Sequence, residues 1–540
     1  MNEIKSDELS KPETKLLPLP DVGDLLFIGI MHILLFARPD YMFQDASTGW
    51  HLTAGQWILE NHAIPKTDLF SYTFPDKAWV AYEWLFDLVA YALTLAGGLN
   101  LLAVAVATII SFIFLKVYDR ARAEGGPLGL VLPVTIFAIF ASAIHWLARP
   151  HIITFLCILL YLTKLEDFYR GTISSVKLYL YIGLLMILWV NCHPAFPLGI
   201  ILIGIYFLAA LKRLIKPGDT DSDKKKNLER VKTLFIAGVI ASGATLINPY
   251  GIDLYKYIIE YLKGSTVIAN TDEFRSPDFH FKLKNIHSFF LLFLMPFFLG
   301  GLAITKHRPS LPYFSTCLLF LHMALSAVRN IPLFAIVSVP AIGLMFSKTI
   351  LHDTTRPLTS AFPKLKQTID KFAYPVQQFA QQEMLCKMHI LPIIYVVFVT
   401  VAAFCGGSIG GAKILSSGFS TSEMPTKTLQ YIKENKLPFD RGFNHDNWGG
   451  LIRYKLGQRV FIDDRADFYG EEFYKKYGAI VQTQPGWSKQ LDEAKIEWIL
   501  MPKNSKLAAA LKTEPQWKVA CEDGLNEEFG SILFVRNNTD

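Results

Sequence analysis

Asp45 is the residue whose type and place first suggest chemistry. It follows the first apolar segment, LLFIGIMHILLF, and precedes a polar and aromatic stretch, STGWHLTAGQWILENH. A carboxylate close to lipid is costly to desolvate unless it has a partner or a function. Such a group could act as a general base and take a proton from a hydroxyl that arrives from water. The same residue could simply cap a helix over residues 47–61, and its position alone does not separate the two interpretations.

Three basic residues stand at the ends of other apolar segments. They are Arg149 in LARPHIITF, His193 in VNCHPAFPLG and Arg329 in SAVRNIPLF. One cation at such a place usually anchors a helix end near the headgroups, but arginine also binds phosphate through two parallel hydrogen bonds. Three on one face of a membrane predict a site for a lipid-linked phosphate or pyrophosphate. The loop NTDEFRSPDFHFK adds Glu273 and Arg275 as candidate substrate-binding residues.

The stretch after Asp45 has the pattern of an amphipathic helix. Trp50 and Trp57 fall on one face at helical spacing, and tryptophan favours the headgroup region, so we expect residues 47–61 to lie along the membrane surface. His51 is a weaker candidate for substrate binding. Asp68, in IPKTDLFSY, is a candidate second acid or an ordinary turn residue.

A bundle of membrane helices must position these residues. Hydrophobic residues make up 51% of the chain and charged residues 19%, and apolar runs recur as far as residue 407. Because a lipid-exposed backbone must satisfy its hydrogen bonds internally, such runs predict transmembrane helices. We expect eleven spans, near residues 22–37, 98–116, 126–147, 151–165, 178–192, 195–213, 231–248, 284–305, 311–328, 331–350 and 388–407.

The apolar stretch 84–97 decides the topology. It is short and contains Asp87, which favours a juxtamembrane or partly inserted helix over a further span. Lys/Arg-rich segments such as KVYDRARAE and DKKKNLERVK then fall on the N-terminal side, as expected of the cytoplasm. The expected parts of this inner-membrane protein are a cytoplasmic tail 1–21, a membrane domain 22–407 with outer loops 38–97 and 249–283, and an outer domain 410–540.

Residues 410–540 differ from the rest in composition. Helix patterns (TKTLQYIKENK, SKQLDEAK, KLAAALKT) alternate with strand-like runs (RVFID, EWILMP, SILFVR), which predicts a small extracytoplasmic α/β domain. The segment FIDDRADFYG is rich in acids and aromatic residues, which suits carbohydrate contact. For Asp463, Asp464 and Arg465 we nevertheless favour a structural role in docking this domain on the bundle.

Other classes of function find no support in the sequence. The six cysteines include no CxxC pair, so neither a disulfide framework nor a zinc site is indicated. The net charge of +6 is not gathered on a basic face, and we expect no nucleic-acid partner.

The order of several short motifs resembles a known group of membrane enzymes. Asp45 opens the pattern DxxxxWHLxxGxxI, which IPxxDxFSYT and WxxxEWL follow, and later blocks are ARPHIITF, WVNCHPAFPLG, DEFRSPDF, RNIPLFAIV and NWGGLIRYKLGQRVFIDDRADFYG. Together they resemble the GT-C-type integral membrane glycosyltransferases, in particular the bacterial RgtA/B/C/D-like group related to the protein O-mannosyltransferase and aminoarabinose transferase families. The resemblance covers most of the chain.

This resemblance implies a fold, an activity and a site. The fold is a GT-C bundle whose first outer loop forms part of the active site, and the family's catalytic acid maps to Asp45. Enzymes of this class pass a sugar from a polyprenyl-phosphate donor to a glycan, lipid or protein outside the cytoplasm. The sequence has one acid here rather than an adjacent pair, so no cofactor is certain, although a divalent cation stays compatible. It also has His151 and Pro194 where relatives often have Gln or Glu and Gly.

The resulting hypothesis is an inverting glycosyltransferase in the lipid bilayer. Asp45 acts as general base, and Arg329, with Arg149 and His193, binds the donor phosphate. A flippase or transporter of lipid-linked sugar is the first alternative, but it predicts ionisable groups within spans and repeated halves, which the sequence does not show. A non-catalytic scaffold that keeps the GT-C fold is the second alternative, and the sequence leaves it open.

Overall fold

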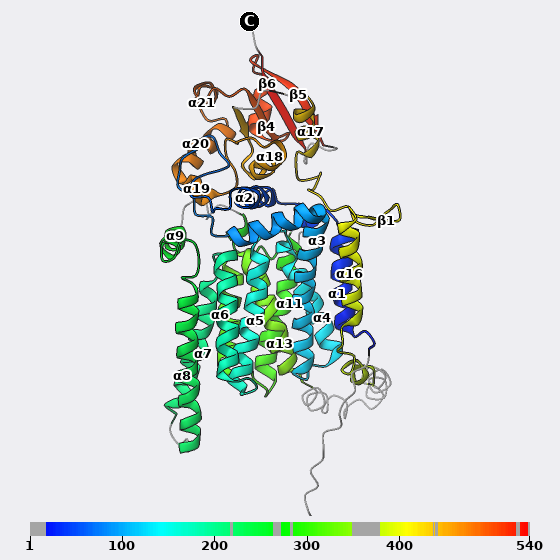
Figure 1. The fold of residues 1–540 in the computed structure, drawn as a ribbon, viewed down its shortest axis with the longest axis vertical. Coiled ribbons are helices and arrows are strands. Elements are labelled where there is room, and N and C mark those ends of the chain that lie inside the picture. The colour runs from blue at the N-terminus through cyan, green and yellow to red at the C-terminus, as the bar shows by residue number, and fades with distance from the viewer. Residues whose placement is uncertain are drawn as a thin grey trace, which may run out of the picture.

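The computed structural model describes residues 18–216, 220–262, 272–280, 285–347, 378–435, 437, 441–524 and 530–537. Most of the expected tail 1–21, part of the loop 249–283 and most of the Lys-rich segment 351–387 lie outside these residues. A bundle of long helices carries a smaller α/β part on one end (Figure 1).

Every range expected to span a membrane contains a helix. Within the described residues, six helices are long and apolar enough to cross a membrane, and three shorter helices are also apolar. The expected polytopic helical fold is therefore confirmed. The bundle helices are α1 (Val22–His32, continued by the π-helical η1, Ile33–Ala37), α3 (Trp84–Ala123), α4 (Leu128–Ser142), α5 (His151–Arg170), α6 (Ser175–Cys192), α7 (Pro197–Leu214), α8 (Asp221–Ala244), α11 (Ile286–Ile304), α12 (Leu311–Ser326), α13 (Ile331–Met345) and α16 (Ile390–Phe404).

Helix α3 accounts for the short apolar stretch at residues 84–97. Its first part lies across the end of the bundle and its second part runs alongside the other helices (Figure 1). The bend falls at Gly97 and Gly98, and Gly98 has a φ of 66°, a left-handed conformation that side chains disfavour. The first part of α3 thus does not run with the spans, which agrees with the expected juxtamembrane placement.

Helix α2 (Ser47–Asn61) lies between α3 and the α/β part. Its glycines allow close backbone approach on two sides. A Cβ at Gly55 would lie 2.0 Å from the carbonyl oxygen of Asp87 in α3. A Cβ at Gly49 would lie 2.5 Å from the carbonyl oxygen of Gly450 in α18 (Gly449–Leu456). The two glycines therefore fix how deeply the α/β part docks on the bundle.

The docking changes the expected role of Trp50. The indole is buried and lies edge-on to the rings of Phe70 and Trp79. A Cβ at Gly450 would lie 3.1 Å from Cδ1 of Trp50. The prediction that Trp50 anchors the helix in the headgroups is wrong, because the α/β part covers this face.

Gly49→Ala is expected to weaken this contact. The added methyl group meets a backbone oxygen that cannot rotate away, so we expect a loss of about 1–3 kcal/mol in the stability of the docked state. The matched control is Gly478→Ala in α20 (Glu471–Val481), where a Cβ meets no atom within 4 Å. The measurement is the protease sensitivity of each purified variant in detergent. Equal resistance of the two variants would contradict the prediction.

The α/β part contains a four-stranded sheet of order β3-β4-β6-β5. β3 pairs parallel with β4, whereas β6 pairs antiparallel with β4 and β5. The strands are β3 (Gly442–Asn444), β4 (Trp498–Pro502), β5 (Trp517–Asp523) and β6 (Ser531–Arg536), and a hairpin of β1 (Ser408–Ile409) and β2 (Ala412–Lys413) precedes them. The other helices are α17 (Thr426–Glu434), α19 (Ala466–Tyr469), α21 (Trp487–Glu493) and α22 (Lys506–Leu511).

The sequence patterns of this part are mostly confirmed. EWILMP and SILFVR form β4 and β6, and the three expected helices appear as α17, α21 and α22. The prediction that RVFID is a strand of the sheet is wrong. Val460 instead forms an isolated parallel bridge with Ser71 of the first outer loop, so this segment joins the two parts of the chain.

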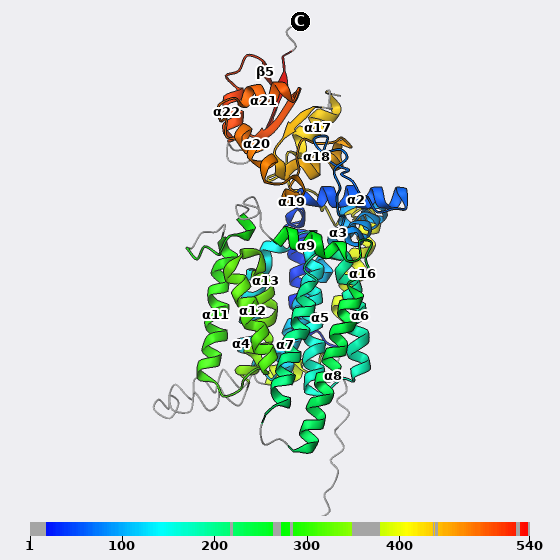
Figure 2. The same cartoon turned by 90° about the vertical axis from the view of Figure 1, so that its left-hand side faces the viewer.

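The two ends of the bundle differ in chemistry. Helix α2, the first part of α3, α9 (Asp253–Leu262) and the α/β part lie at one end (Figures 1 and 2). The basic beginning of α8, with Lys224, Lys225 and Lys226, lies at the opposite end (Figure 1). The candidate residues after α1, before α5, after α6 and before α13 belong to the end that carries the α/β part.

Candidate active site

Asp45 lies between the 3₁₀ turn η2 (Tyr41–Phe43) and α2, where the first outer loop begins. One carboxylate oxygen accepts a hydrogen bond from Arg149 Nη1 at 2.7 Å. The other accepts from the backbone N–H of Ser47 at 2.8 Å and contacts the Ser47 hydroxyl. The side chain is 26% exposed, so a substrate can reach it. Asp45 therefore both caps the start of α2 locally and forms an ion pair across 104 residues.

A second acid meets Asp45 from the far end of the chain. Asp464 lies between α18 and α19, and its Oδ2 contacts the hydroxyl of Ser47, the same hydroxyl that contacts Asp45. Residues 45 and 464 thus share one serine. Asp45, which has no adjacent acid in the sequence, is paired with a second acid through the docking of the α/β part.

The two carboxyl groups differ in proton affinity. Burial alone would raise the pKa of Asp45, but the guanidinium of Arg149 and the hydrogen bonds from Ser47 outweigh it and hold this pKa below its usual value. Burial and the negative charge of Asp45 raise the pKa of Asp464 to about 7, although Arg149 opposes them. At neutral pH the pair therefore carries about one to two negative charges beside one arginine.

Further basic groups lie in the region of Arg149, since the charges of Arg149 and Arg329 both act on His145. Arg329, in the 3₁₀ turn η6 (Val328–Asn330), bonds Glu273 at 3.3 Å and lies 4.3 Å from the ring of Phe274. His145 is buried, and neither ring nitrogen has a hydrogen-bond partner among the described residues. The Nε of Arg149 is also buried without a partner there. Buried polar groups usually have a partner, so the Nε–H of Arg149 and the single N–H of a neutral His145 ring are available to donate to an anionic ligand.

Glu83 and His193 face each other across the same region. His193 Nδ1 lies 2.9 Å from the Thr154 hydroxyl and accepts from the backbone N–H of Ala195 at 3.3 Å, so in a neutral ring the proton belongs on Nε2. That Nε2 lies 4.0 Å from Glu83 Oε1. Burial raises the pKa of Glu83 to about 8, against the opposing charge of Arg149. Glu83 is thus protonated at neutral pH and can donate a hydrogen bond.

Three of the predicted site residues, Asp68, His51 and Arg275, have partners other than Asp45. Asp68 is buried and bonds Arg465 at 2.7 Å, so it holds the first outer loop against the α/β part. His51 Nδ1 bonds Asp87 at 2.6 Å and is buried in the contact of α2 with α3. Arg275 is exposed, and its backbone oxygen accepts from the N–H of Val328. None of these three side chains bonds Asp45, whose partners are Arg149 and Ser47, although the charge of Arg149 acts on His51.

An open groove of about 620 Å³ is lined by Trp84, the residue that follows Glu83. Its walls are apolar side chains of α3, α6 and the chain after α8, and Asn191 lies among them. Asn191 accepts from Trp84 Nε1 at 2.8 Å and donates to the carbonyl of Ile247 at 2.8 Å, so it ties the three segments together. The groove has the apolar lining that an apolar chain requires.

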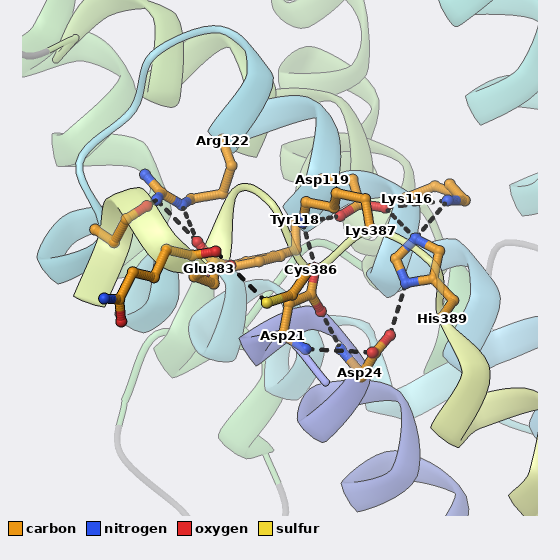
Figure 3. A network of polar contacts seen from close by, with 12 residues as sticks. Asp21, Asp24, Lys116, Tyr118, Asp119, Arg122, Glu383, Cys386, Lys387 and His389 are labelled. Carbon is orange, nitrogen blue, oxygen red and sulfur yellow. Dashed lines mark hydrogen bonds and ion pairs between the residues drawn. The ribbon is translucent and has the colours of Figure 1, made fainter. Parts of the chain in front are cut away.

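A separate polar cluster lies at the opposite end of the bundle. Asp21, Asp24 and His389 have ligand atoms within 4.8 Å of one another, which could hold a metal ion (Figure 3). Lys387 already contacts Asp21 and bonds Asp119 at 2.8 Å, and Asp21 and Asp24 cap α1 reciprocally. This cluster is therefore better explained as a clamp that fixes the beginning of α16 to α1 and α3.

The fold is similar to that of the oligosaccharyltransferase of Archaeoglobus fulgidus, known from a crystal structure of its apo form. The TM-score is 0.53 at 12% sequence identity, and the similarity covers 89% of this chain and 69% of the archaeal chain. The chain has a GT-C-like fold. No protein-family model matches the sequence, and no curated protein matches it. The GT-C-like fold and the apolar helices make this a multi-pass membrane protein.

Sequence reasoning did not connect two acids with Asp45: Glu83, and Asp464, for which it favoured a docking role. Glu83 stands in the motif WVAYEWL, where its place before a juxtamembrane helix was the available signal. Asp464 stands between two residues that do serve docking, Asp463 and Arg465. No local pattern separates it from them, because its partner Ser47 is 417 residues away.

Proposed function

We propose that the protein is an inverting glycosyltransferase that takes a sugar from a polyprenyl-phosphate donor. The observation that carries this proposal is the ion pair of Asp45 with Arg149, which is partly exposed at the end of the bundle, with Arg329 and His193 in the same region. Asp45 accepts the proton of the acceptor hydroxyl while the acceptor oxygen attacks C1 of the sugar. The bond from C1 to the phosphate oxygen breaks, and the lipid phosphate leaves.

The basic groups are suited to the leaving phosphate. Arg329, with Arg149 and His193, would bind it, and the unpartnered nitrogens of His145 add to the same region. Charge that develops on the phosphate would be stabilised in a partly dehydrated site, where such donors are most effective. The apolar groove lined by Trp84 would take the polyprenyl chain. Glu273 would hold Arg329 in place, whereas Arg275 lies exposed at the rim.

The acceptor is a glycan, a lipid or a protein on the outer side of the membrane. We place the site and the α/β part outside the cytoplasm because the Lys/Arg-rich segments lie at the other end of the bundle. Single cysteines at Ser222 and Lys489 test this orientation in a variant without exposed native cysteine. An impermeant thiol reagent added to intact cells should label Cys at 489 and not at 222. The reverse pattern would place the site in the cytoplasm.

The decisive experiment measures transfer of label. Membranes with and without the protein are incubated with polyprenyl-phosphate carrying a labelled sugar, and labelled product is separated from donor lipid. Product that depends on the protein supports the transferase. Labelled lipid that crosses vesicles without transfer would instead indicate a flippase. Neither product nor movement, in a correctly inserted protein, would indicate a scaffold.

Chelation is expected to leave transfer unchanged within about twofold, because Arg149 already supplies the positive charge that a divalent cation would bring to Asp45. The measurement compares transfer in EDTA with transfer in added Mg²⁺ or Mn²⁺. A loss of activity in EDTA that either ion restores would show that the site needs a metal, and would contradict this prediction.

A further inference from the structure

We propose that Asp464 is a positioning residue for sugar transfer, which shares a proton with Asp45 through Ser47 and thereby sets the basicity of Asp45. The inference rests on the proposed function and deepens it, because it makes the α/β part a contributor to the active site rather than only a docked domain.

The number of donors around each acid is the first argument. Asp463 accepts from Arg465 Nε at 2.8 Å, from Arg465 Nη2 at 2.8 Å and from the Tyr469 hydroxyl at 3.0 Å. Asp45 accepts from Arg149 and from a backbone N–H. Both Asp463 and Asp45 therefore have enough hydrogen-bond donors to be stabilised as anions. Asp464 contacts only the shared hydroxyl, and its Oδ1 is buried with no partner among the described residues. A buried, unpartnered oxygen costs far less on a neutral carboxyl than on an anion.

The second argument is the single proton of the serine. Ser47 Oγ lies in hydrogen-bonding contact with both carboxyl groups but can donate to only one of them. The other contact is satisfied only if that carboxyl carries a proton and donates to Ser47. Asp45 already has two other donors, so the proton belongs on Asp464. The order of donation then runs from Asp464 to Ser47 and from Ser47 to Asp45.

The charged surroundings agree with this assignment. The titratable groups that face Asp464 come from every element around it: Asp45 and Arg149 from the bundle end, Glu83 before α3, Asp463 and Arg465 on its own segment, and Tyr474 of α20. Negative neighbours and burial raise the pKa of Asp464 to about 7, and Arg149 is the opposing positive charge. The proton is therefore lost within the physiological range.

Loss of that proton changes Asp45. At a pH below the pKa of Asp464, Ser47 donates fully to Asp45 and weakens Asp45 as a base. At a pH above the pKa of Asp464, the carboxylates of Asp45 and Asp464 compete for the hydroxyl proton of Ser47, and the added negative charge of Asp464 raises the proton affinity of Asp45. A stronger base removes the acceptor proton faster, so transfer is expected to rise roughly three- to tenfold between pH 6 and pH 8.

The test compares pH profiles of label transfer in membranes. Asp464→Asn keeps a neutral donor to Ser47, so it should hold the slow rate at every pH without the rise. Asp464→Glu should keep a rise. The matched control is Asp467→Asn, an acid of the same segment whose carboxylate contacts Tyr257 instead of Ser47, and it should keep the wild-type profile. An unchanged rise in Asp464→Asn overturns the inference, and so does a complete loss of transfer at all pH values.

A second readout does not depend on activity. Infrared difference spectra between pH 6 and pH 8 should show a larger loss of protonated carboxyl absorption in the wild type and in Asp467→Asn than in Asp464→Asn, where Glu83, with a pKa of about 8, still loses part of its proton. Transfer without a band that depends on Asp464 overturns the inference. A band that depends on Asp464 in a protein that transfers no sugar supports the proton assignment, and overturns the proposed function instead.

Discussion

Asp45→Asn is expected to lower the rate of sugar transfer by about a hundred- to ten-thousandfold. The amide has nearly the shape of the carboxylate, but it has one acceptor oxygen in place of two, so it can accept from only one of Arg149 and the N–H of Ser47. It also cannot take the acceptor proton. The effect should fall mainly on the rate at saturating donor, because the base is lost while Arg329 and His193 keep their contacts and only Arg149 loses its ion-pair partner. Label transfer in membranes, at matched protein levels, measures it.

Folding should survive this change. The Asp45–Arg149 pair is partly exposed, with about a quarter of each side chain accessible, so its contribution to stability is only about 1 kcal/mol or less. The matched control is Asp40→Asn. Asp40 belongs to the same loop, but it accepts from the hydroxyl of Ser420 at 3.0 Å and does not touch the site. Near-normal transfer is expected there. If Asp45→Asn also transferred normally, Asp45 would not be the base.

Much of the fold could be predicted because its signals are local. A membrane span is long and apolar, so its position can be read along the chain, and all eleven expected ranges contain helices. The placement of Arg149 near Asp45 follows from the same logic. Two polar residues at the same end of neighbouring spans lie at the same depth in the membrane. The positions of the span ends therefore predict that Asp45 and Arg149 lie on one face of the membrane.

The pairing within the site could not be read in this way. The sequence predicts His51 as a candidate for substrate binding, but in the structure its side chain bonds Asp87 of α3. Asp464 meets Ser47 only because two glycines let the α/β part dock closely on α2. Contacts between residues 417 positions apart depend on that rigid docking, and no local periodicity records it.

Arg465→Met is expected to release the α/β part from the first outer loop. The guanidinium bonds Asp68 at 2.7 Å and Asp463 at 2.8 Å, and these carboxylates are fully buried. Its centre also lies 4.3 Å from the ring of Phe70. Methionine fills much of the space but leaves two buried anions without a counter-charge, which costs about 3–5 kcal/mol. Since 1.4 kcal/mol is a tenfold change, the undocked population should rise roughly a hundred- to several-thousandfold.

Limited proteolysis in detergent follows this population, and the matched control is Arg441→Met. Arg441 is exposed and lies 5.5 Å from the ring of Tyr72, so its loss should leave the cleavage rate nearly unchanged. A triple variant with Asp68→Asn, Asp463→Asn and Arg465→Met separates charge from shape. Because it removes the buried anions, it should regain much of the resistance. If the triple variant were as labile as Arg465→Met alone, the guanidinium would act through packing.

The rate of sugar transfer should fall in each variant to the extent that the α/β part undocks. Undocking moves Asp464 away from Ser47 and leaves Asp45 and Arg149 in the bundle.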